Sequence, residues 1–418
     1  MNKKIKVFVL SDMILSPSGV GTQTKYMIDA LLKTGRYQFV CFGGAMKHQS
    51  YEPIKIDEYG DDVIIYPVDG YGSPDSIRSV LRSHKPDILW FMTDPRFYEW
   101  LWDIENEVRP LVPMVYYHVW DNYPYPRYNK PHYESCDAIV SISKVTDDIV
   151  RTVAPSVEAY HIPHAVDNNI FSKKEDAELA EFKKEYGFDE GKFVVFWNNR
   201  NARRKQSGTV IWWFNEFLKK VGKDNAKLVM HTDIRDPHGQ DLPAIIQELG
   251  LENGEVMFST AKLPSHLLAY LYNCADCTVN IADAEGFGLG TLESLSCETP
   301  IIVTMTGGMQ EQVTDGENWF GVGLEPASSC VIGSLQVPFI REDRVSEEDF
   351  VDALMKLYNM SKEERESLGK AGREHVLKNY NFDDYGKRWI DLLDKIHEEH
   401  GSWENRKKHN RWVLKEIE

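Results

Sequence analysis

Short runs rich in β-branched and aromatic residues alternate with amphipathic stretches along most of the chain. In the first half the apolar runs predict strands at Lys6–Leu10, Gln38–Phe42, Val63–Val68, Ile88–Met92, Pro113–His118 and Ala138–Ile142. Between them, Thr22–Leu32 and Ser76–Ser83 carry apolar residues at helical spacing and predict helices. Strands that alternate with helices predict a parallel sheet with helical crossovers, so the expected fold class is α/β.

The second half of the chain repeats this alternation. Further strands are predicted at Phe193–Trp197, Leu228–His231, Val256–Ser259, Cys277–Ile281 and Ile301–Thr304. Helices are predicted at Gly208–Lys219, Ser265–Tyr272 and Thr291–Cys297. We therefore expect two Rossmann-like domains, each with its own parallel sheet, and we expect ligands at the carboxyl ends of the strands.

The charged, helical segment Ser172–Lys192 separates the two sets of strands. It predicts an N-terminal domain over residues 1–172 and a C-terminal domain over residues 190–380. The remaining residues, 381–418, are helical by pattern. There, aromatic and aliphatic residues from Phe382 to Ile396 recur at helical spacing, so we expect one buried face on that helix.

Charge and composition exclude several classes of protein. The 418 residues carry a net charge of −17, whereas a protein that grips nucleic acid usually presents a basic face. No uncharged apolar run approaches the roughly 18 residues of a membrane span. The first apolar run, Ile5–Leu10, is short and contains Lys6, so it predicts a strand and not a secretory leader. We expect a cytoplasmic protein without a transmembrane segment.

Metal and redox sites find little support in the sequence. The six cysteines include one C-x-x-C pair, Cys274 and Cys277, without the second pair that a structural zinc site needs, so buried reduced thiols are expected. The segment from His231 to His238 contains two histidines and two aspartates, but without a firm ligand spacing. We therefore predict no metal site.

The first loop contains Gly19-Val20-Gly21 ahead of a predicted helix. A dinucleotide fingerprint would need a third glycine where Thr24 stands, a tighter turn after Leu10, and an acidic residue after the next strand, which ends in Phe42–Gly44. A hydride-transfer enzyme is thus disfavoured, and no phosphate-binding Walker motif is present. The two glycines either bring backbone N–H groups to a phosphate or simply form a turn.

Cations cluster directly after the strand Phe193–Trp197, in the segment NRNARRK. Arg200 is the first cation of this cluster and Lys205 is the last, and the segment lies in an otherwise acidic chain. Such a cluster is either a solvated turn or a clamp for a diphosphate, since arginine binds phosphate bidentately and lysine acts as a mobile point charge.

A glycine loop separates two glutamates, Glu285 and Glu293, in the segment AEGFGLGTLESLS. Its glycines let the backbone approach a ligand closely, and a helix that starts near Gly290 offers N–H groups to an anion. We expect Glu285 on the loop and Glu293 in the first turn of the helix, where their carboxylates contact hydroxyl groups of one long ligand. The alternative is a surface helix that begins with glycine.

Together these motifs resemble retaining glycosyltransferase family 4. The resemblance rests on the E-x7-E pattern from Glu285 to Glu293, on NRNARRK, on HIPHAVDNNIF at residues 161–171 and on TGGMQEQV at residues 306–313. It is clearest over residues 190–315, whereas the first loop departs from the commoner glycine pair. The resemblance implies the GT-B fold, in which two Rossmann-like domains face each other across a cleft and C-terminal helices cross back to the first domain.

The resemblance also implies roles for individual residues. It places Gly19, Gly21, Arg200, Lys205, Glu285, Gly286, Phe287, Gly288, Leu289, Gly290 and Glu293 at the donor. Arg200 and Lys205 would neutralise the diphosphate, Glu285 and the loop backbone would hold the transferred sugar, and Glu293 would hold the ribose. His118, in VYYHVWDNYPYP, matches a family histidine near the sugar, although a buried structural histidine is the alternative. The catalytic set would be His118, Arg200, Lys205 and Glu285.

The expected function is transfer of a hexose from a nucleotide sugar to a glycan or another hydroxyl acceptor. The resemblance implies retention of configuration and no metal cofactor; mannose from GDP-mannose is the best guess for the donor, on family frequency. The aromatic run Tyr116–Tyr133 would either stack on the acceptor or pack a loop. A homodimer is possible. Alternatives are a nucleotide-sugar epimerase, a glycan phosphorylase, or a non-catalytic nucleotide-sugar-binding protein of the same fold.

Overall fold

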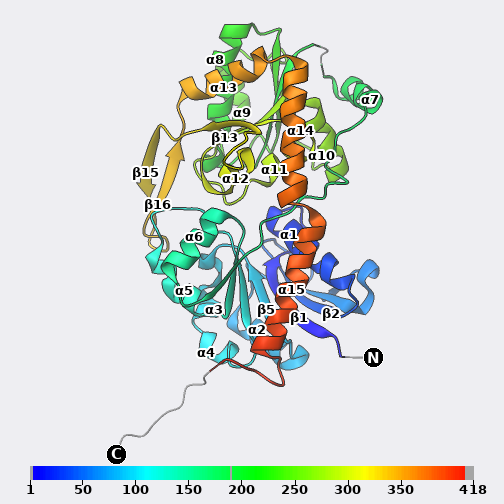
Figure 1. The fold of residues 1–418 in the computed structure, drawn as a ribbon, viewed down its shortest axis with the longest axis vertical. Coiled ribbons are helices and arrows are strands. Elements are labelled where there is room, and N and C mark those ends of the chain that lie inside the picture. The colour runs from blue at the N-terminus through cyan, green and yellow to red at the C-terminus, as the bar shows by residue number, and fades with distance from the viewer. Residues whose placement is uncertain (1–2, 189–190, 410–418) are drawn as a thin grey trace, which may run out of the picture. The chain divides into compact units, whose positions relative to one another are not determined.

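The computed structural model describes residues 3–188 and 191–409, and its chain forms two compact units (Figure 1). Unit 1 consists of Met1–Trp120, Tyr125–Ala165 and Phe382–Glu418, and unit 2 consists of Asp121–Pro124 and Val166–Asn381. The sequence placed the end of the first domain at residue 172, whereas the chain leaves unit 1 at Ala165 and returns to it at Phe382.

Unit 1 is built on an eight-stranded sheet of order β3-β4-β2-β1-β5-β6-β7-β8. Its strands are β1 (Ile5–Asp12), β2 (Tyr37–Gly44), β3 (Ile54–Lys55), β4 (Val63–Pro67), β5 (Ile88–Met92), β6 (Met114–His118), β7 (Ala138–Ser141) and β8 (Glu158–His161). All neighbours pair in parallel except β3, which is antiparallel to β4. The central strands β5 and β6 are buried throughout and mostly apolar, because helices cover both faces of a parallel sheet.

The helices of unit 1 connect these strands. They are α1 (Gly19–Leu32), α2 (Pro74–His84), α3 (Glu99–Trp102), α4 (Glu105–Val108), α5 (Lys130–Glu134), α6 (Lys144–Val153) and α15 (Phe382–His400), with 3₁₀ turns η1 (Asp57–Asp62), η2 (Pro95–Tyr98) and η3 (Arg127–Asn129). Local chemistry fixes where they start. In α2, for example, the Ser73 hydroxyl accepts from the backbone of Ser76, the Ser76 hydroxyl accepts in return, and Pro74 fills the first turn.

Helix α15 supplies part of the core of unit 1, as its predicted buried face requires. Trp389 is fully buried, with its ring 5.7 Å from that of Trp90 and 4.9 Å from that of Tyr117. The Tyr385 hydroxyl donates to the Gln23 carbonyl of α1 over 2.9 Å. Helix α15 is thus packed on α1 (Figure 1).

Unit 2 is built on a six-stranded parallel sheet of order β11-β10-β9-β12-β13-β14. Its strands are β9 (Phe193–Asn198), β10 (Ala226–His231), β11 (Val256–Ser259), β12 (Cys277–Asn280), β13 (Ile301–Thr304) and β14 (Gly321–Leu324), and β15 (Ser328–Ile332) and β16 (Ile340–Arg344) form a separate antiparallel hairpin. Strands β9, β10, β12 and β13 sit at the centre, so their carboxyl ends meet at one edge.

The helices of unit 2 are α7 (Asp176–Tyr186), α8 (Ser207–Val221), α9 (Leu242–Leu249), α10 (Ser265–Cys274), α11 (Leu289–Ser296), α12 (Gln310–Val313), α13 (Glu347–Asn359) and α14 (Lys362–Asn379), with 3₁₀ turns η4 (Arg203–Lys205) and η5 (Gly307–Met309). Helices α8 and α13 bury Phe214, Phe217 and Phe350 in a core with Val195 and Leu228 of the sheet. This packing holds the strand ends, and the loops that follow them, in fixed positions.

These findings confirm the predicted α/β class and each predicted strand, with bounds shifted by at most two residues. None of the helices within residues 3–188 and 191–409 combines the length and the apolar character that a membrane span requires. The six cysteines are free thiols, and Cys274 and Cys277 are both buried.

Candidate functional site

Two loops of unit 2 come together at the carboxyl ends of adjacent strands. The first, after β9, carries Arg200, Arg204 and Lys205; the second, after β12, carries Glu285 and the glycines. Because β9 and β12 are paired in parallel, their following loops emerge at the same edge of the sheet. The structure thus joins two motifs that the sequence presents far apart.

Lys205 and Glu285 form a buried ion pair at this edge. The Lys205 ammonium donates to Glu285 Oε2, and both side chains are close to nine-tenths buried. Asn280, the last residue of β12, lies 3.5 Å from the same oxygen. Burial would raise the pKa of Glu285, but the cations of Lys205 and Arg204 lower it below its ordinary value, so this carboxyl is ionised. A cation and an anion are thereby held out of water at the strand ends.

Arg200 is positioned differently from Lys205. Its guanidinium forms a bidentate pair with Asp236, with contacts of 2.6 and 3.1 Å, and its side chain is 62% exposed. Arg204 donates to the Ala284 carbonyl, one residue before Glu285. Arg200 is therefore an exposed cation paired with Asp236, while Arg204 and Lys205 fasten the first loop to the second.

Asp121 adds a further carboxyl to the Lys205–Glu285 pair. Burial raises the pKa of Asp121 to about 6, with Glu285 adding to the rise and Arg204 and Lys205 opposing it. Its amide neighbour Asn122 donates to Asp121 Oδ1. Sequence analysis did not select Asp121, because a lone aspartate in an aromatic loop carries no spacing signal.

The glycine loop turns directly into helix α11. Gly288 precedes the helix with φ +87°, and a Cβ on it would lie 2.7 Å from Thr291 Oγ1, so this position requires glycine. Gln312 of α12 fixes the loop: its Nε2 donates to the Phe287 carbonyl over 2.6 Å, and its Oε1 accepts from Thr291 Oγ1 over 2.7 Å. The first N–H groups of α11, at Leu289 and Gly290, have no carbonyl partner within the helix, and such a helix start favours a bound anion.

Glu293 lies in the second turn of α11, not in its first turn as expected, because the helix begins at Leu289. The Tyr272 hydroxyl donates to Glu293 Oε2 over 2.7 Å, and Asn198 Nδ2 donates to the same hydroxyl over 2.7 Å. Burial raises the pKa of Glu293 to about 7, although the Tyr272 bond opposes the rise. Gly290 borders this group, since a Cβ there would lie 3.2 Å from both Asn198 O and Tyr272 Oη.

The remaining predicted residues belong to unit 1. Gly19 begins α1, and the Gly21 N–H donates to the Ser18 hydroxyl over 3.0 Å. The same hydroxyl donates to Asp12 Oδ2 over 2.6 Å, so a side chain caps this helix start. A Cβ on Gly21 would lie 2.7 Å from the Met13 carbonyl, which accounts for the glycine by packing alone.

His118 ends strand β6 and is fully buried. Its Nε2 is 2.7 Å from the Tyr133 hydroxyl, and Nδ1 makes no hydrogen bond within the described residues. Burial lowers its pKa to about 3, so the imidazole is neutral at pH 7. Tyr116 and Tyr133, at the ends of the aromatic run, are also buried, which favours packing over acceptor stacking for these two side chains.

Comparison with known proteins shows which part of the chain is similar to a known family. Residues 179–329 match the model of the family described as glycosyl transferases group 1. The matched segment contains the cation cluster, both glutamates and the glycine loop. The resemblance found in the sequence is therefore confirmed for this part of the chain.

Curated relatives are similar over part of their length. The chain is 23% identical to N-acetyl-alpha-D-glucosaminyl L-malate synthase of Bacillus anthracis over 45% of this chain and 46% of the relative. It is 26% identical to alpha-monoglucosyldiacylglycerol synthase of Streptococcus pneumoniae over 58% of this chain and 52% of that enzyme. The chain thus spans about half the length of these two relatives.

Solved structures show the same fold over nearly the whole chain. The sucrose-phosphate synthase of Thermosynechococcus elongatus superposes with a TM-score of 0.73 at 15% identity, covering 95% of this chain and all of that one. Anabaena HepE in complex with UDP-glucose superposes with a TM-score of 0.70 at 14% identity, covering 94% and 100%. These similarities confirm the predicted GT-B fold class.

Proposed function

From the match of residues 179–329 to glycosyltransferases and the charge arrangement at the strand ends of unit 2, we propose that the protein is a retaining hexosyltransferase. It moves a hexose from a nucleotide sugar to a glycan or another hydroxyl acceptor without a catalytic metal. The observation that carries this proposal is the buried Lys205–Glu285 pair beside the glycine loop and the start of α11. A buried cation, a carboxylate and free N–H groups together suit a sugar diphosphate.

Binding of the donor changes the partners of both cations. Lys205 divides its charge between Glu285 and the diphosphate, while Arg200 turns from Asp236 toward the phosphate oxygens. Glu285, relieved of part of its cation, then accepts hydrogen bonds from hydroxyls of the transferred sugar. Glu293, oriented by Tyr272, accepts from the hydroxyls of the ribose.

The reaction follows from where charge develops. The bond between the anomeric carbon and the diphosphate oxygen breaks, leaving positive character on the sugar and negative charge on the departing oxygen. Lys205, Arg200 and the N–H groups of α11 stabilise that negative charge. The acceptor hydroxyl forms its bond to the anomeric carbon from the side of the leaving group, and its proton passes to the departing phosphate, so configuration is retained.

His118 has a supporting part in this proposal. Because its imidazole is neutral, it orients the sugar through a hydrogen bond and does not act as a nucleophile. Nδ1 is the ring nitrogen free for this contact within the described residues, and the contact requires movement of the residues that cover it. Gly19 contributes its backbone N–H near the phosphate, whereas the Gly21 N–H would first have to leave the Ser18 hydroxyl.

The donor that we propose is GDP-mannose. Relatives carry names with different sugars, such as alpha-monoglucosyldiacylglycerol synthase and the mannosylfructose-phosphate synthase of Agrobacterium fabrum, so the sugar needs a direct test. The proposed compartment is the reducing cytoplasm, where free thiols such as these six persist.

Calorimetric titration with GDP-mannose, UDP-glucose and UDP-N-acetylglucosamine, followed by donor turnover, tests this function. Lys205→Ala and Arg200→Ala should each lower turnover about 10²–10³-fold and weaken donor binding, because each removes a cation from the diphosphate. Lys219→Ala, at an exposed lysine on α8, should keep wild-type turnover. Asp236→Ala should not cripple turnover, because Arg200 leaves Asp236 when the donor binds. Wild-type activity in the Arg200/Lys205 double variant would refute the clamp, and tight binding without turnover would indicate a binding protein.

A further inference from the structure

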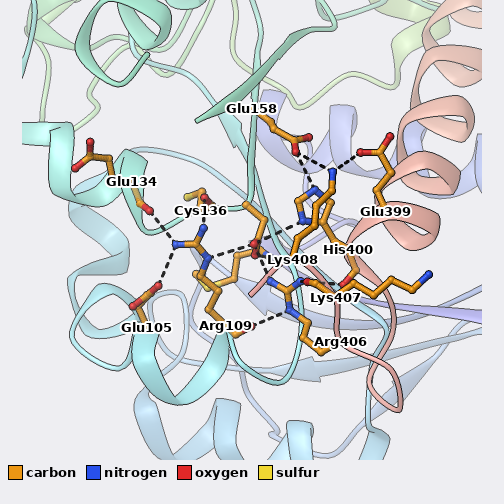
Figure 2. A network of polar contacts seen from close by, with 12 residues as sticks. Glu105, Arg109, Glu134, Cys136, Glu158, Glu399, His400, Arg406, Lys407 and Lys408 are labelled. Carbon is orange, nitrogen blue, oxygen red and sulfur yellow. Dashed lines mark hydrogen bonds and ion pairs between the residues drawn. The ribbon is translucent and has the colours of Figure 1, made fainter. Parts of the chain in front are cut away.

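A second group of polar side chains surrounds a cavity of about 330 Å³ in unit 1, and it plays no part in the proposed transfer. The cavity lies where β8, the end of α15 and the segment 401–408 meet, and it is lined by Arg109, Asp137, Glu158, His400 and Lys408, among others. Figure 2 shows Glu158, His400 and Lys408 pointing toward one another, together with Glu399. The question is what such a group holds.

His400, the last residue of α15, is the first indication. It is only 4% exposed, and neither ring nitrogen makes a hydrogen bond of good geometry within the described residues. Nε2 lies 3.3 Å from Glu158 Oε1, and Nδ1 lies 3.7 Å from Asp137 Oδ1. Buried polar atoms normally make hydrogen bonds. An imidazole that lies among carboxylates without a hydrogen bond is therefore a candidate metal ligand.

The carboxylates beside His400 already hold a cation. The Lys408 ammonium lies 2.5 Å from Glu399 Oε2 and 3.4 Å from Glu158 Oε1. Two carboxylates that hold one cation in this way also offer oxygen ligands to a metal ion.

The geometry of the three groups suits one small cation. One donor atom from each of Glu158, Glu399 and His400 lies within 4.8 Å of the others. Ligand atoms around a zinc ion, with bonds of about 2.0–2.2 Å, are about 3.3 Å apart. Small side-chain movements would bring the three donor atoms to this separation. The side chains of Glu158 and Glu399 are each 36% exposed, which gives an ion access from solvent.

Asp137 completes the arrangement from behind His400. Arg406 lies 2.7 Å and Arg109 lies 3.2 Å from its Oδ1, and its Oδ2 accepts from the Met114 backbone over 2.8 Å, so it is fixed in place. A carboxylate on the Nδ1 side of a histidine retains the proton there and leaves Nε2 free to bind a metal. In this geometry Nε2 is the nitrogen that faces Glu158.

We propose that Glu158, Glu399 and His400 bind a divalent transition-metal ion, of which Zn²⁺ is the representative, and that the ion displaces the Lys408 ammonium. One imidazole and two carboxylates form a ligand set of this class, with solvent completing the coordination. The site is independent of the donor site in unit 2, and binding does not require turnover.

Calorimetric titration of the full chain, without an affinity tag, with zinc chloride tests the site. His400→Gln and Glu399→Gln should each weaken binding at least tenfold, because each removes a ligand. Glu398→Gln, which changes the exposed neighbouring carboxylate, should bind as the wild type does. Cobalt(II) should give visible absorption bands with the wild type that are lost in His400→Gln.

Lys408→Ala provides a prediction of opposite sign. It removes the competing ammonium from the surface of unit 1, so it should bind zinc several-fold more tightly than the wild type. Thermal unfolding without metal checks that each variant is folded. Equal affinity in the wild type, His400→Gln and Glu399→Gln, or weaker binding in Lys408→Ala, would overturn the proposal.

Discussion

Individual residues at the site have properties that depend on their burial more than on their type. Lys205 and Glu285 were both predicted to contact a donor, but the sequence contains no sign that they pair with each other across 80 positions. Glu293 is similar: its place in a helix was predictable, whereas its bond to Tyr272 and its raised pKa depend on α10 packing beside α11. Asn198, Tyr272 and Gln312 were missed because each contributes a single polar side chain from a different element.

Glu293 should make the protein less stable as the pH rises. Its pKa is raised from 4.5 to about 7 in the folded chain, so between these values the folded state binds more protons than the unfolded state. The free energy of unfolding should therefore fall from about pH 4.5 to pH 7, by on the order of 3 kcal/mol at most. Urea unfolding at pH 5 and pH 8, in wild type and Glu293→Gln, measures this difference.

The Glu293→Gln variant should lose this part of the pH dependence while weakening donor binding. The amide stays neutral, so it avoids the cost of a buried charge at pH 8 but is a poorer acceptor for ribose hydroxyls. In the wild type, donor affinity should rise with pH through about 7 as the carboxylate forms. An identical stability profile in both proteins would show that Glu293 does not titrate in this range.

At the scale of elements, most strands of the two sheets were predictable because they are apolar runs, whereas β3 and β8 at the two margins of the first sheet were not predicted. The hairpin β15–β16 was not: β16 reads IREDR, and its strand character comes from pairing with β15, not from propensity. Strand β14, GVGL, was missed because two of its four residues are glycine. The start of α11 was placed near Gly290 or Thr291, after its actual start at Leu289, which moved Glu293 from the second turn into the first.

The start of α11 should depend on Gly288. Replacing it with alanine adds a left-handed backbone penalty and a Cβ 2.7 Å from Thr291 Oγ1 and 3.0 Å from Met309 Cγ. Gly288→Ala should lower the free energy of unfolding by about 2–4 kcal/mol and weaken donor binding. Gly250→Ala, at φ +61° with nothing within 4 Å, is the matched control and should cost about 1 kcal/mol in urea unfolding. An equal decrease in the free energy of unfolding in the two variants would show that the contacts at Gly288 do not contribute to stability.

At the scale of the whole molecule, the chain passes from unit 1 to unit 2 and back. The sequence indicated two sets of strands and a buried helical face after residue 381, but the pattern of a helix does not state which sheet it covers. Here the face of α15 packs against residues from the N-terminal part of the chain, Gln23 and Trp90 among them. The stability of unit 1 therefore depends on residues that come after all of unit 2.

Trp389→Ala tests this dependence. Trp389 is fully buried between Trp90 and Tyr117, so its truncation should lower the stability of unit 1 by about 3–5 kcal/mol. Trp212→Ala, on α8 of unit 2 with Trp212 44% exposed, should change stability by less than about 0.5 kcal/mol. Hydrogen exchange should show faster opening in β1, β5 and β6 of the first variant only; an unchanged rate there would contradict the packing described.

The return of the chain to unit 1 also determines an order during protein synthesis. A ribosome releases residues 166–381 before it releases α15. All residues of unit 2 have therefore been synthesised while unit 1 still lacks a core helix. Until then Trp90 and its neighbours are uncovered, and a nascent chain stalled before Phe382 presents that apolar surface to chaperones. The unit translated first is thus the one that finishes folding last.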